Sequence, residues 1–292
     1  MKLANETAAM AVRALEKATA ELKADGPWRW QCVAQNGAPL AFTASLEEGF
    51  LRLSSTSETN GSSVRAPMDL LLGNSSLPGG VRFALDPAGR GVHMRTDITV
   101  LDEESVRHRI NWALRGFCAG FRWLKSRDLN GEEEAQGTPN VECAALGDLL
   151  RETSWTCVER GPNDFSAALD CDSVPAARIR LADQGVLCDV EIARRANPAI
   201  HCRQALAVFL VTASDALRLV RGCAAEADGQ LSVGFQVCLA AAPASEEIAH
   251  ALAALSVACQ SCGREVNVLF DGAVARSYLA AREFETTNHE TQ

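Results

Sequence analysis

Two cysteines near the C-terminal end, Cys259 and Cys262, have the Cys-x-x-Cys spacing that thioredoxin-like redox sites use. With a second such pair they would also supply the ligands of a structural zinc site. The sequence has no second pair, and both cysteines fall on the apolar stripe of an amphipathic helix, together with Ile248, Leu252 and Leu255. We therefore expect both thiols to be reduced, metal-free and buried in that helix.

The other residue types that carry out chemistry lack the spacing that catalysis needs. The five histidines show no metal-ligand spacing. Gly79 and Gly80 lead into a strand and not into a helix N-terminus, so the geometry of a phosphate-binding loop is absent. His93, with Arg95 and Asp97, fits the solvated face of a sheet. We expect no catalytic residue, no cofactor and no metal, and hence no enzyme.

The elements that would position these residues occur twice. Trp30-Gln-Cys-Val is answered by Trp155-Thr-Cys-Val, and residues 51–53 (LRL) are answered by residues 179–181 (IRL). Residues 81–83 (VRF) are likewise answered by residues 217–219 (LRL). A repeat this long is a domain-sized unit, so we expect two similar domains side by side.

Apolar periodicity divides the first half into eight elements. It predicts an opening helix over residues 6–24, three strands near residues 28–33, 41–43 and 50–53, a short helix near residues 68–72, a hairpin of residues 81–85 and 92–100, and a closing helix from Asp102 to about residue 124.

The second half repeats this order after a polar segment. A shorter opening helix is expected near residues 146–150, strands near residues 155–159, 165–171, 177–182 and 186–193, an apolar helix at residues 205–210, a hairpin strand at residues 231–239 and a closing helix from Ser245. We expect domains at 1–127 and 141–280, a linker at 128–140 and a disordered tail at 281–292.

Composition narrows the classes of partner. The chain has 292 residues, 47% of them hydrophobic, and a formal net charge of −9. This acidity argues against nucleic acid and against an anionic membrane surface as partners. No apolar run approaches the length of a membrane span, and the N-terminus lacks the apolar core of a signal peptide, so we expect a cytoplasmic protein.

The order helix, three strands, helix, two strands, long helix resembles the type III secretion chaperone fold and the related bacterial YbjN-like family. The resemblance is carried by residues 70–74 (LLLGN), 79–86 (GGVRFALD) and the strand and helix after residue 92. Members usually have one such unit and commonly form homodimers that hold a partner polypeptide. Two fused units imply an intramolecular pseudo-dimer.

Our expectation is therefore an α+β protein with two homologous domains, each an antiparallel sheet packed with helices in an α-β-β-β-α-β-β-α plan. We expect a monomeric, chaperone-like or scaffolding module that binds a protein or peptide. The alternatives are an enzyme with an unrecognised site between the halves and a small-ligand or regulatory sensor.

Two sets of side chains are candidates for this binding role. We expect the partner to contact three tryptophans, Trp28, Trp30 and Trp155. We expect the two middle helices to form the contact between the domains, through Leu70, Leu71, Leu72, Leu206, Phe209 and Leu210.

Overall fold

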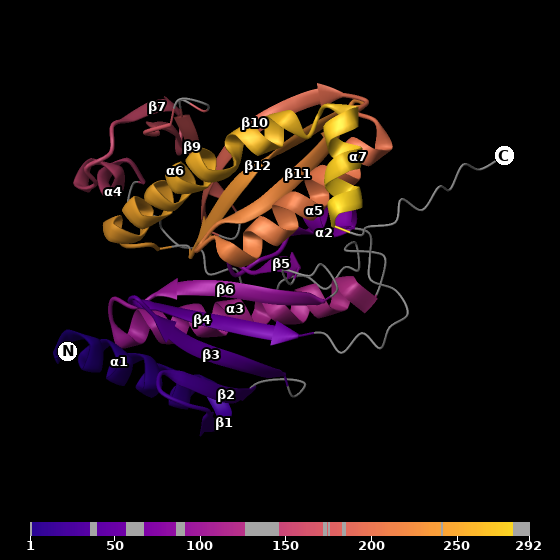
Figure 1. The fold of residues 1–292 in the computed structure, drawn as a ribbon. Helices are drawn as coiled ribbons and strands as arrows, with labels where there is room; N and C mark the ends of the chain where they lie inside the picture. Colours follow the sequence, from indigo (N-terminus) through magenta and orange to yellow (C-terminus); the bar gives the residue numbers. More distant parts are fainter. Residues whose placement is uncertain are drawn as a thin grey trace.

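The computed structural model describes residues 2–35, 40–56, 67–85, 91–125, 146–171, 174, 176–182, 185–240 and 242–282. Within these residues the chain forms two six-stranded antiparallel sheets and seven helices, so the α+β class predicted from the sequence is confirmed (Figure 1). Sheet A belongs to the N-terminal half, and sheet B belongs to the C-terminal half.

The first half contains three helices and the six strands of sheet A. In chain order these are α1 (Lys2–Ala18), β1 (Thr19–Ala24), β2 (Arg29–Ala34), β3 (Ala41–Glu47), β4 (Phe50–Thr56), α2 (Pro67–Asn74), β5 (Arg82–Leu85), β6 (Val92–Thr99) and α3 (Glu103–Lys125).

The second half contains four helices and the six strands of sheet B. In chain order these are α4 (Leu146–Glu152), β7 (Cys157–Gly161), β8 (Asp164–Ala168), β9 (Ala176–Ala182), β10 (Gly185–Ala196), α5 (Ile200–Ala216), β11 (Arg221–Ala227), β12 (Gln230–Leu239), α6 (Ser245–Val268) and α7 (Gly272–Ala281).

The two sheets have the same strand order. Sheet A runs β1-β2-β3-β4-β6-β5, and sheet B, read from its other end, runs β7-β8-β9-β10-β12-β11. Each half therefore places four consecutive strands before its middle helix and returns with a hairpin whose second strand inserts next to the fourth. The expected α-β-β-β-α-β-β-α plan was wrong in two respects. It had three strands before the middle helix and not four, and it had no helix after the closing helix, where the second half has α7.

The missing strand of the first half is β1. The sequence predicted one helix over residues 6–24, because Ala18 and Leu22 continue the helical spacing of apolar residues. In the structure the helix ends at Ala18, and the Thr19 hydroxyl donates to the Leu15 carbonyl at 2.8 Å. The next residues form β1, in which Leu22 pairs with Cys32 of β2. Sheet pairing prevails here over the local helical pattern.

Because of this extra strand, the sequence segments that match between the two halves do not lie on corresponding strands. Trp30-Gln-Cys-Val lies on β2, whereas Trp155-Thr-Cys-Val leads into β7, which occupies the place of β1. The segments 51–53 and 179–181 likewise lie on β4 and β9, which do not correspond. The strand order matches Val81-Arg82 at the start of β5 with Val220-Arg221 at the start of β11.

Helices cover one face of each sheet. In the first half, α1 packs along α3 over the face from which Phe42, Leu53 and Met94 point into the core. In the second half, α6 packs on β10 and β12. The uncovered side of the first sheet, the open face of sheet A, carries polar residues that are successive cross-strand neighbours: Lys23, Gln31, Thr43 and Ser54. The next neighbour, Arg95 of β6, is covered by the other half.

Parts of the expected domain boundaries lie outside the described residues. This holds for the whole linker at 128–140 and for the tail after residue 282, while Ala281 belongs to α7. Among the helices that the structure describes, none combines the length and the apolar character required to cross a membrane.

Candidate functional site

The closest packing between the two halves involves four elements, which we call the seam: α2, β5, α5 and β11. Helix α2 packs against α5 and β11, and α5 packs against β5. Strands β5 and β11 are the outermost strands of their sheets. The seam therefore covers one edge of each sheet, where unpaired backbone groups would otherwise be exposed.

Arg82 of β5 crosses the seam with a side chain that is 0% exposed. Its Nε donates to the carbonyl of Ser214 at 2.7 Å, and its Nη2 donates to the carbonyl of Leu217 at 2.9 Å. The same Nη2 donates to Oδ2 of Asp97 on β6 at 2.6 Å. A residue of the first half thus satisfies carbonyls at the C-terminal end of α5, which the helix itself leaves unpaired.

Arg221 of β11 makes the reciprocal contact and is also buried. Its Nη1 donates to the carbonyls of Leu77 at 2.6 Å and Val81 at 3.1 Å, which lie between α2 and β5. Its Nε donates to Oε1 of Gln236 on β12 at 2.8 Å. The two arginines occupy the same place in the strand order of their halves. Each bonds to carbonyls at or after the end of the other half's middle helix.

Side chains at the ends of the middle helices continue this pattern. Asn74 of α2 accepts from the backbone N–H of Phe83 at 2.6 Å, and Ser214 of α5 accepts from the N–H of Gly222 at 2.7 Å. Phe83 and Gly222 each follow the buried arginine of their strand. Asn74 also donates to the carbonyl of Gly222 at 3.0 Å, which joins the two halves directly.

Asp97 is the central anion of the first half's side of the seam. Its side chain is 1% exposed and accepts from Arg52 at 2.8 Å, from Arg82 and from the backbone N–H of Leu219 at 3.1 Å. Burial opposes its ionisation, but the charges of Arg82 and Arg52 outweigh burial and lower its pKa to about 2. Asp97 is therefore ionised at neutral pH and has no proton to donate.

A second anion of the seam, Asp215 at the end of α5, contacts β6. Its Oδ1 lies 2.6 Å from Nε2 of His93 and 2.6 Å from Nη1 of Arg95. Burial opposes its ionisation, while the bond from His93 and the charge of Arg95 lower its pKa below the usual range. The expected solvated face around His93 was wrong, since His93 and Arg95 both bond to the other half.

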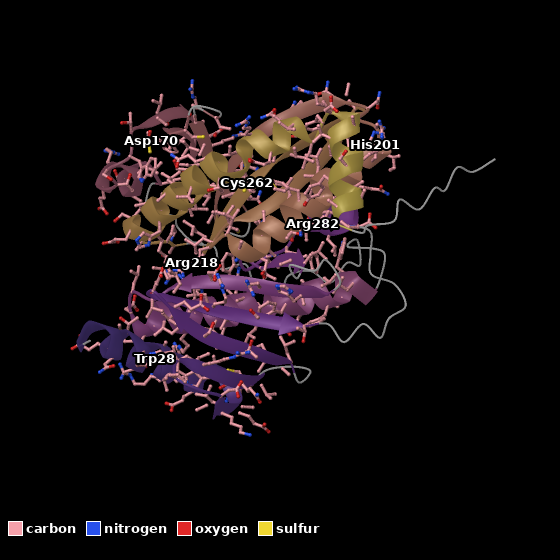
Figure 2. The ribbon with its side chains drawn as sticks, in the orientation of Figure 1. Trp28, Asp170, His201, Arg218, Cys262 and Arg282 are labelled. Atoms are coloured by element: carbon pink, nitrogen blue, oxygen red, sulfur yellow. The ribbon has the colours of Figure 1, made fainter. Side chains whose placement is uncertain are left out.

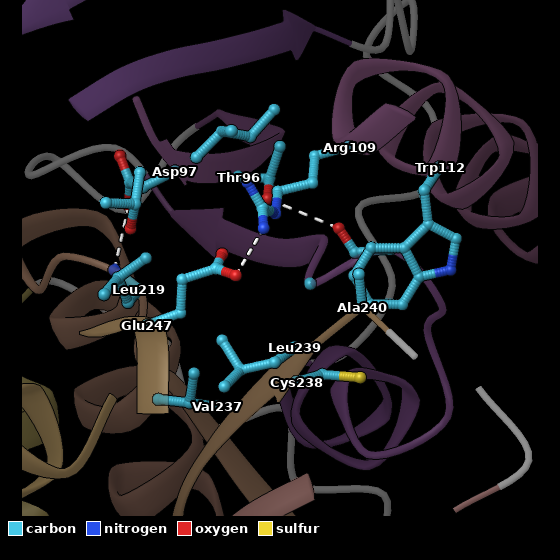
Figure 3. A pocket seen from close by; sticks show the side chains of 14 residues that line it. Thr96, Asp97, Arg109, Trp112, Leu219, Val237, Cys238, Leu239, Ala240 and Glu247 are labelled. Atoms are coloured by element: carbon cyan, nitrogen blue, oxygen red, sulfur yellow. Dashed lines mark hydrogen bonds and ion pairs between the residues drawn. The ribbon is translucent and has the colours of Figure 1, made fainter. Parts of the chain in front are cut away.

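A small hollow borders this network, and Asp97 and Leu219 belong to its lining (Figure 3). Its lining comes from both halves and includes Gly79, Gly80, Thr96, Arg109, Trp112, Leu239 and Glu247. Glu247, in the first turn of α6, accepts from Nη2 of Arg109 and from the backbone N–H of Ala244 at 2.9 Å. Burial raises the pKa of Glu247, against the opposing charge of Arg109.

A carboxyl with a raised pKa beside an arginine has the chemistry of a general acid or base. The hollow, however, has room for roughly one or two water molecules, which is too little for a metabolite-sized substrate. Nε and Nη1 of Arg109 are buried there without a partner among the described residues. Nor does the described part of the chain hold a group of three His, Cys, Asp or Glu side chains placed for a metal ion.

The three tryptophans expected to contact a partner lie in different environments. Trp28 (Figure 2) is 44% exposed and lies in the turn before β2 with a φ of 60°. Trp30 is 7% exposed and belongs to the core. Trp155 is half-buried ahead of β7. Trp28 and Trp30 therefore do not share one surface, because the strand begins only after Trp28. Contact of a partner with the three tryptophans stays a prediction.

The six residues expected between the domains lie on α2 and α5, the two helices that pack together at the seam. Leu70, Leu71, Leu206 and Leu210 are buried, while Leu72 and Phe209 are half-buried. The contacts of their individual side chains stay a prediction.

Cys259 and Cys262 are free thiols buried on α6, as predicted from the apolar stripe. Burial raises the pKa of Cys259 to about 12, so its reactive thiolate form is scarce at neutral pH.

Sequence reasoning missed the buried arginines of the seam. One signal was available, since Val-Arg occurs both at residues 81–82 and at residues 220–221 just after a loop. An arginine inside an apolar strand is seldom buried without a bonded partner, which points to a structural contact.

No protein-family model, no curated protein and no solved structure matches this chain. A function therefore has to be argued from the site itself.

Proposed function

We propose that this chain is a non-enzymatic protein-binding module, chaperone-like or scaffolding in kind, that holds a partner polypeptide. The observation that carries this proposal is the use of charge at the seam. Three carboxyls between the halves have shifted pKa values: Asp97, Asp215 and Glu247. Each of them bonds to an arginine, and for Asp215 and Glu247 that arginine belongs to the other half. Groups whose chemistry suits catalysis thus hold the two halves together.

The common strand order of the two halves supports a duplicated unit, and the reciprocal arginines support an intramolecular pseudo-dimer. The resemblance to the type III secretion chaperone fold implies the same arrangement, with two units held together and a polypeptide as client.

Strand addition at a sheet edge is disfavoured as the mode of binding. The edges away from the seam end in β1 and β7. Strand β1 has a register irregularity and exposes Glu21 and Lys23, and β7 has another and exposes Glu159 and Arg160. Short, irregular and charged edges are a common protection against pairing with a further strand.

The open face of sheet A is the surface best suited to a polar polypeptide segment. Its Lys23 and Gln31 are exposed, and neither side chain forms a hydrogen bond or an ion pair within the described part of the chain. The corresponding face of sheet B differs, because its charges are already paired: Arg178 with Asp164, and Arg180 with Asp189. Sheet A therefore offers the free donors.

The enzyme alternative has one observation in its favour, the raised pKa of Glu247 beside Arg109 in the hollow. A screen of hydrolase and transferase substrates tests it. Turnover that is abolished by Glu247→Gln would establish the enzyme and refute the binding module.

The binding proposal is tested by capturing polypeptides on the full chain, expressing each one and measuring its affinity by calorimetry. We expect an open-face variant, Gln31→Glu with Thr43→Glu, to bind about tenfold more weakly or worse. Ser166→Glu on sheet B, where Ser166 occupies the place of Gln31, is the matched control and should bind normally. Circular dichroism checks that all variants fold. The proposal is contradicted if the full chain shows no direct binding, by calorimetry, to any of the captured polypeptides.

A further inference from the structure

Helix α6 exposes a continuous line of side chains, the outer stripe of α6, whose members are alternately four and three residues apart. The stripe consists of Glu246, His250, Ala253, Val257, Gln260 and Arg264, all exposed. This spacing is the one by which two helices pack along each other. At the centre of the stripe Val257 is 54% exposed.

The corresponding helix of the first half, α3, provides an internal comparison. Buried Ile110 and Phe117 of α3 correspond to buried Leu252 and Cys259 of α6, each 142 positions later. The same offset aligns the outer stripe of α6 with Glu104, His108, Asn111, Arg115, Cys118 and Arg122.

The two stripes agree at their ends and differ at their centres. Glutamate, histidine and arginine occupy the same end positions in both helices. In α3 the centre is Asn111 and exposed Arg115, which suit water, whereas in α6 it is Ala253 and Val257. On α6 an exposed apolar centre thus lies between charged ends, which is the pattern of an apolar core with a polar rim that interfaces have.

We propose that a second copy of this chain binds here, by antiparallel pairing of α6 with α6 about a twofold axis near Leu255. In this register Val257 of each copy lies against Ala253 of the other, so that a larger side chain meets a smaller one. His250 lies opposite Gln260, and Glu246 lies opposite Arg264. The contact is isologous and closes at two copies.

The charges select this orientation. An antiparallel pair places each Glu246 near an Arg264 of the other copy, whereas a parallel pair would oppose like charges at both ends. Glu246 and Arg264 have no ion-pair partner among the described residues, so both are available. The first half borders only the N-terminal end of the stripe, where the rings of Phe50 and His250 lie 6.0 Å apart.

This dimer goes beyond the proposed partner binding and departs from the monomer expected from the sequence. Sedimentation equilibrium of the full chain over a hundredfold range of concentration tests it. We expect a monomer–dimer equilibrium that Val257→Arg weakens by about tenfold or more. Arg115→Glu on α3, at the position corresponding to Val257, is the matched control and should leave the equilibrium unchanged.

Charge exchange provides the sharper test. Glu246→Arg alone and Arg264→Glu alone each oppose like charges at both ends, so each variant should be monomeric. An equimolar mixture of the two should dimerise, because every end then pairs opposite charges. A wild-type chain that stays monomeric at every concentration overturns the proposal. So does a dimer whose dissociation constant is unchanged by Val257→Arg and by the charge exchange.

Discussion

Replacing Arg82 by methionine keeps most of the side-chain volume and removes three bonds at once, to Ser214, Leu217 and Asp97. Breaking a buried ion pair by removing one partner costs about 3–5 kcal/mol, because the remaining charge is left buried. Arg52 still contacts Asp97 at 2.8 Å and offsets part of that cost. We therefore expect Arg82→Met to lower the free energy of unfolding by about 3–4 kcal/mol at neutral pH.

The loss should depend on pH. The pKa of Asp97 is lowered to about 2 in the folded chain from an ordinary value of 3.8. The stabilisation linked to this shift, about 2 kcal/mol, is fully present above pH 3.8 and disappears as pH falls through about 2. In Arg82→Met the pKa of Asp97 rises towards or above 3.8, so the difference from wild type should shrink below about pH 4.

Two matched variants isolate this reasoning. Arg221→Met removes the reciprocal arginine, whose side-chain partner Gln236 does not titrate, so its loss of stability should stay constant with pH. Arg218→Ala removes an exposed pair with Glu48 across the halves and should cost less than about 1 kcal/mol (Figure 2). Urea unfolding followed by tryptophan fluorescence near pH 7 and pH 3 measures all three. A cost for Arg82→Met no larger than that of Arg218→Ala, or one that grows in acid, would refute the argument.

Three further predictions concern the core. Cys259 should react with a thiol reagent far more slowly in the folded chain than in urea, since burial raises its pKa to about 12; equal rates would contradict this. Gly234→Ala should lower the free energy of unfolding by about 3 kcal/mol or more, because the added Cβ would collide with the carbonyl of Val190. Gly161→Ala, whose added Cβ would have nothing within 4 Å, should lower it by less than about 1 kcal/mol, and thermal unfolding measures both. Trp30→Ala should lower stability by about 3–5 kcal/mol and Trp28→Ala by about 1 kcal/mol or less, and similar losses would show that burial is not the cause.

The sequence predicted the elements with strong apolar periodicity and little of how they pair. The closing helix with Cys259 and the alternating strand of residues 231–239 were both placed correctly, because burial of one face imposes a period that a sequence displays. Strand β1 was missed, since its pairing with β2 lies outside any local pattern. Register between distant strands is set by tertiary contacts, so the Trp-x-Cys-Val match aligned the halves one strand out of step.

The seam shows the same limit for a candidate site. Arg82, Asp97, Arg221 and Gln236 are ordinary polar residues in the sequence, and only the strand order brings the two arginines opposite the connections they bond. The two Val-Arg pairs indicate buried arginines, but the sequence does not identify the carbonyls that they bond across the seam, which are more than a hundred residues away. The middle helices were easier to identify, since their apolar character indicates burial on more than one side.

The polar centre of α3, with Asn111 and Arg115, determines how far assembly can proceed. A chain with one self-complementary helix face stops at a pair, because the pairing consumes that face in both copies. With a second such face on α3, each pair would keep a free end on either side and grow into an open filament. Arg115→Val, combined with Asn111→Ala, would remove that stop. Because the two halves belong to one chain, α3 can face water while the corresponding helix α6 forms a contact. Two identical subunits cannot divide these roles.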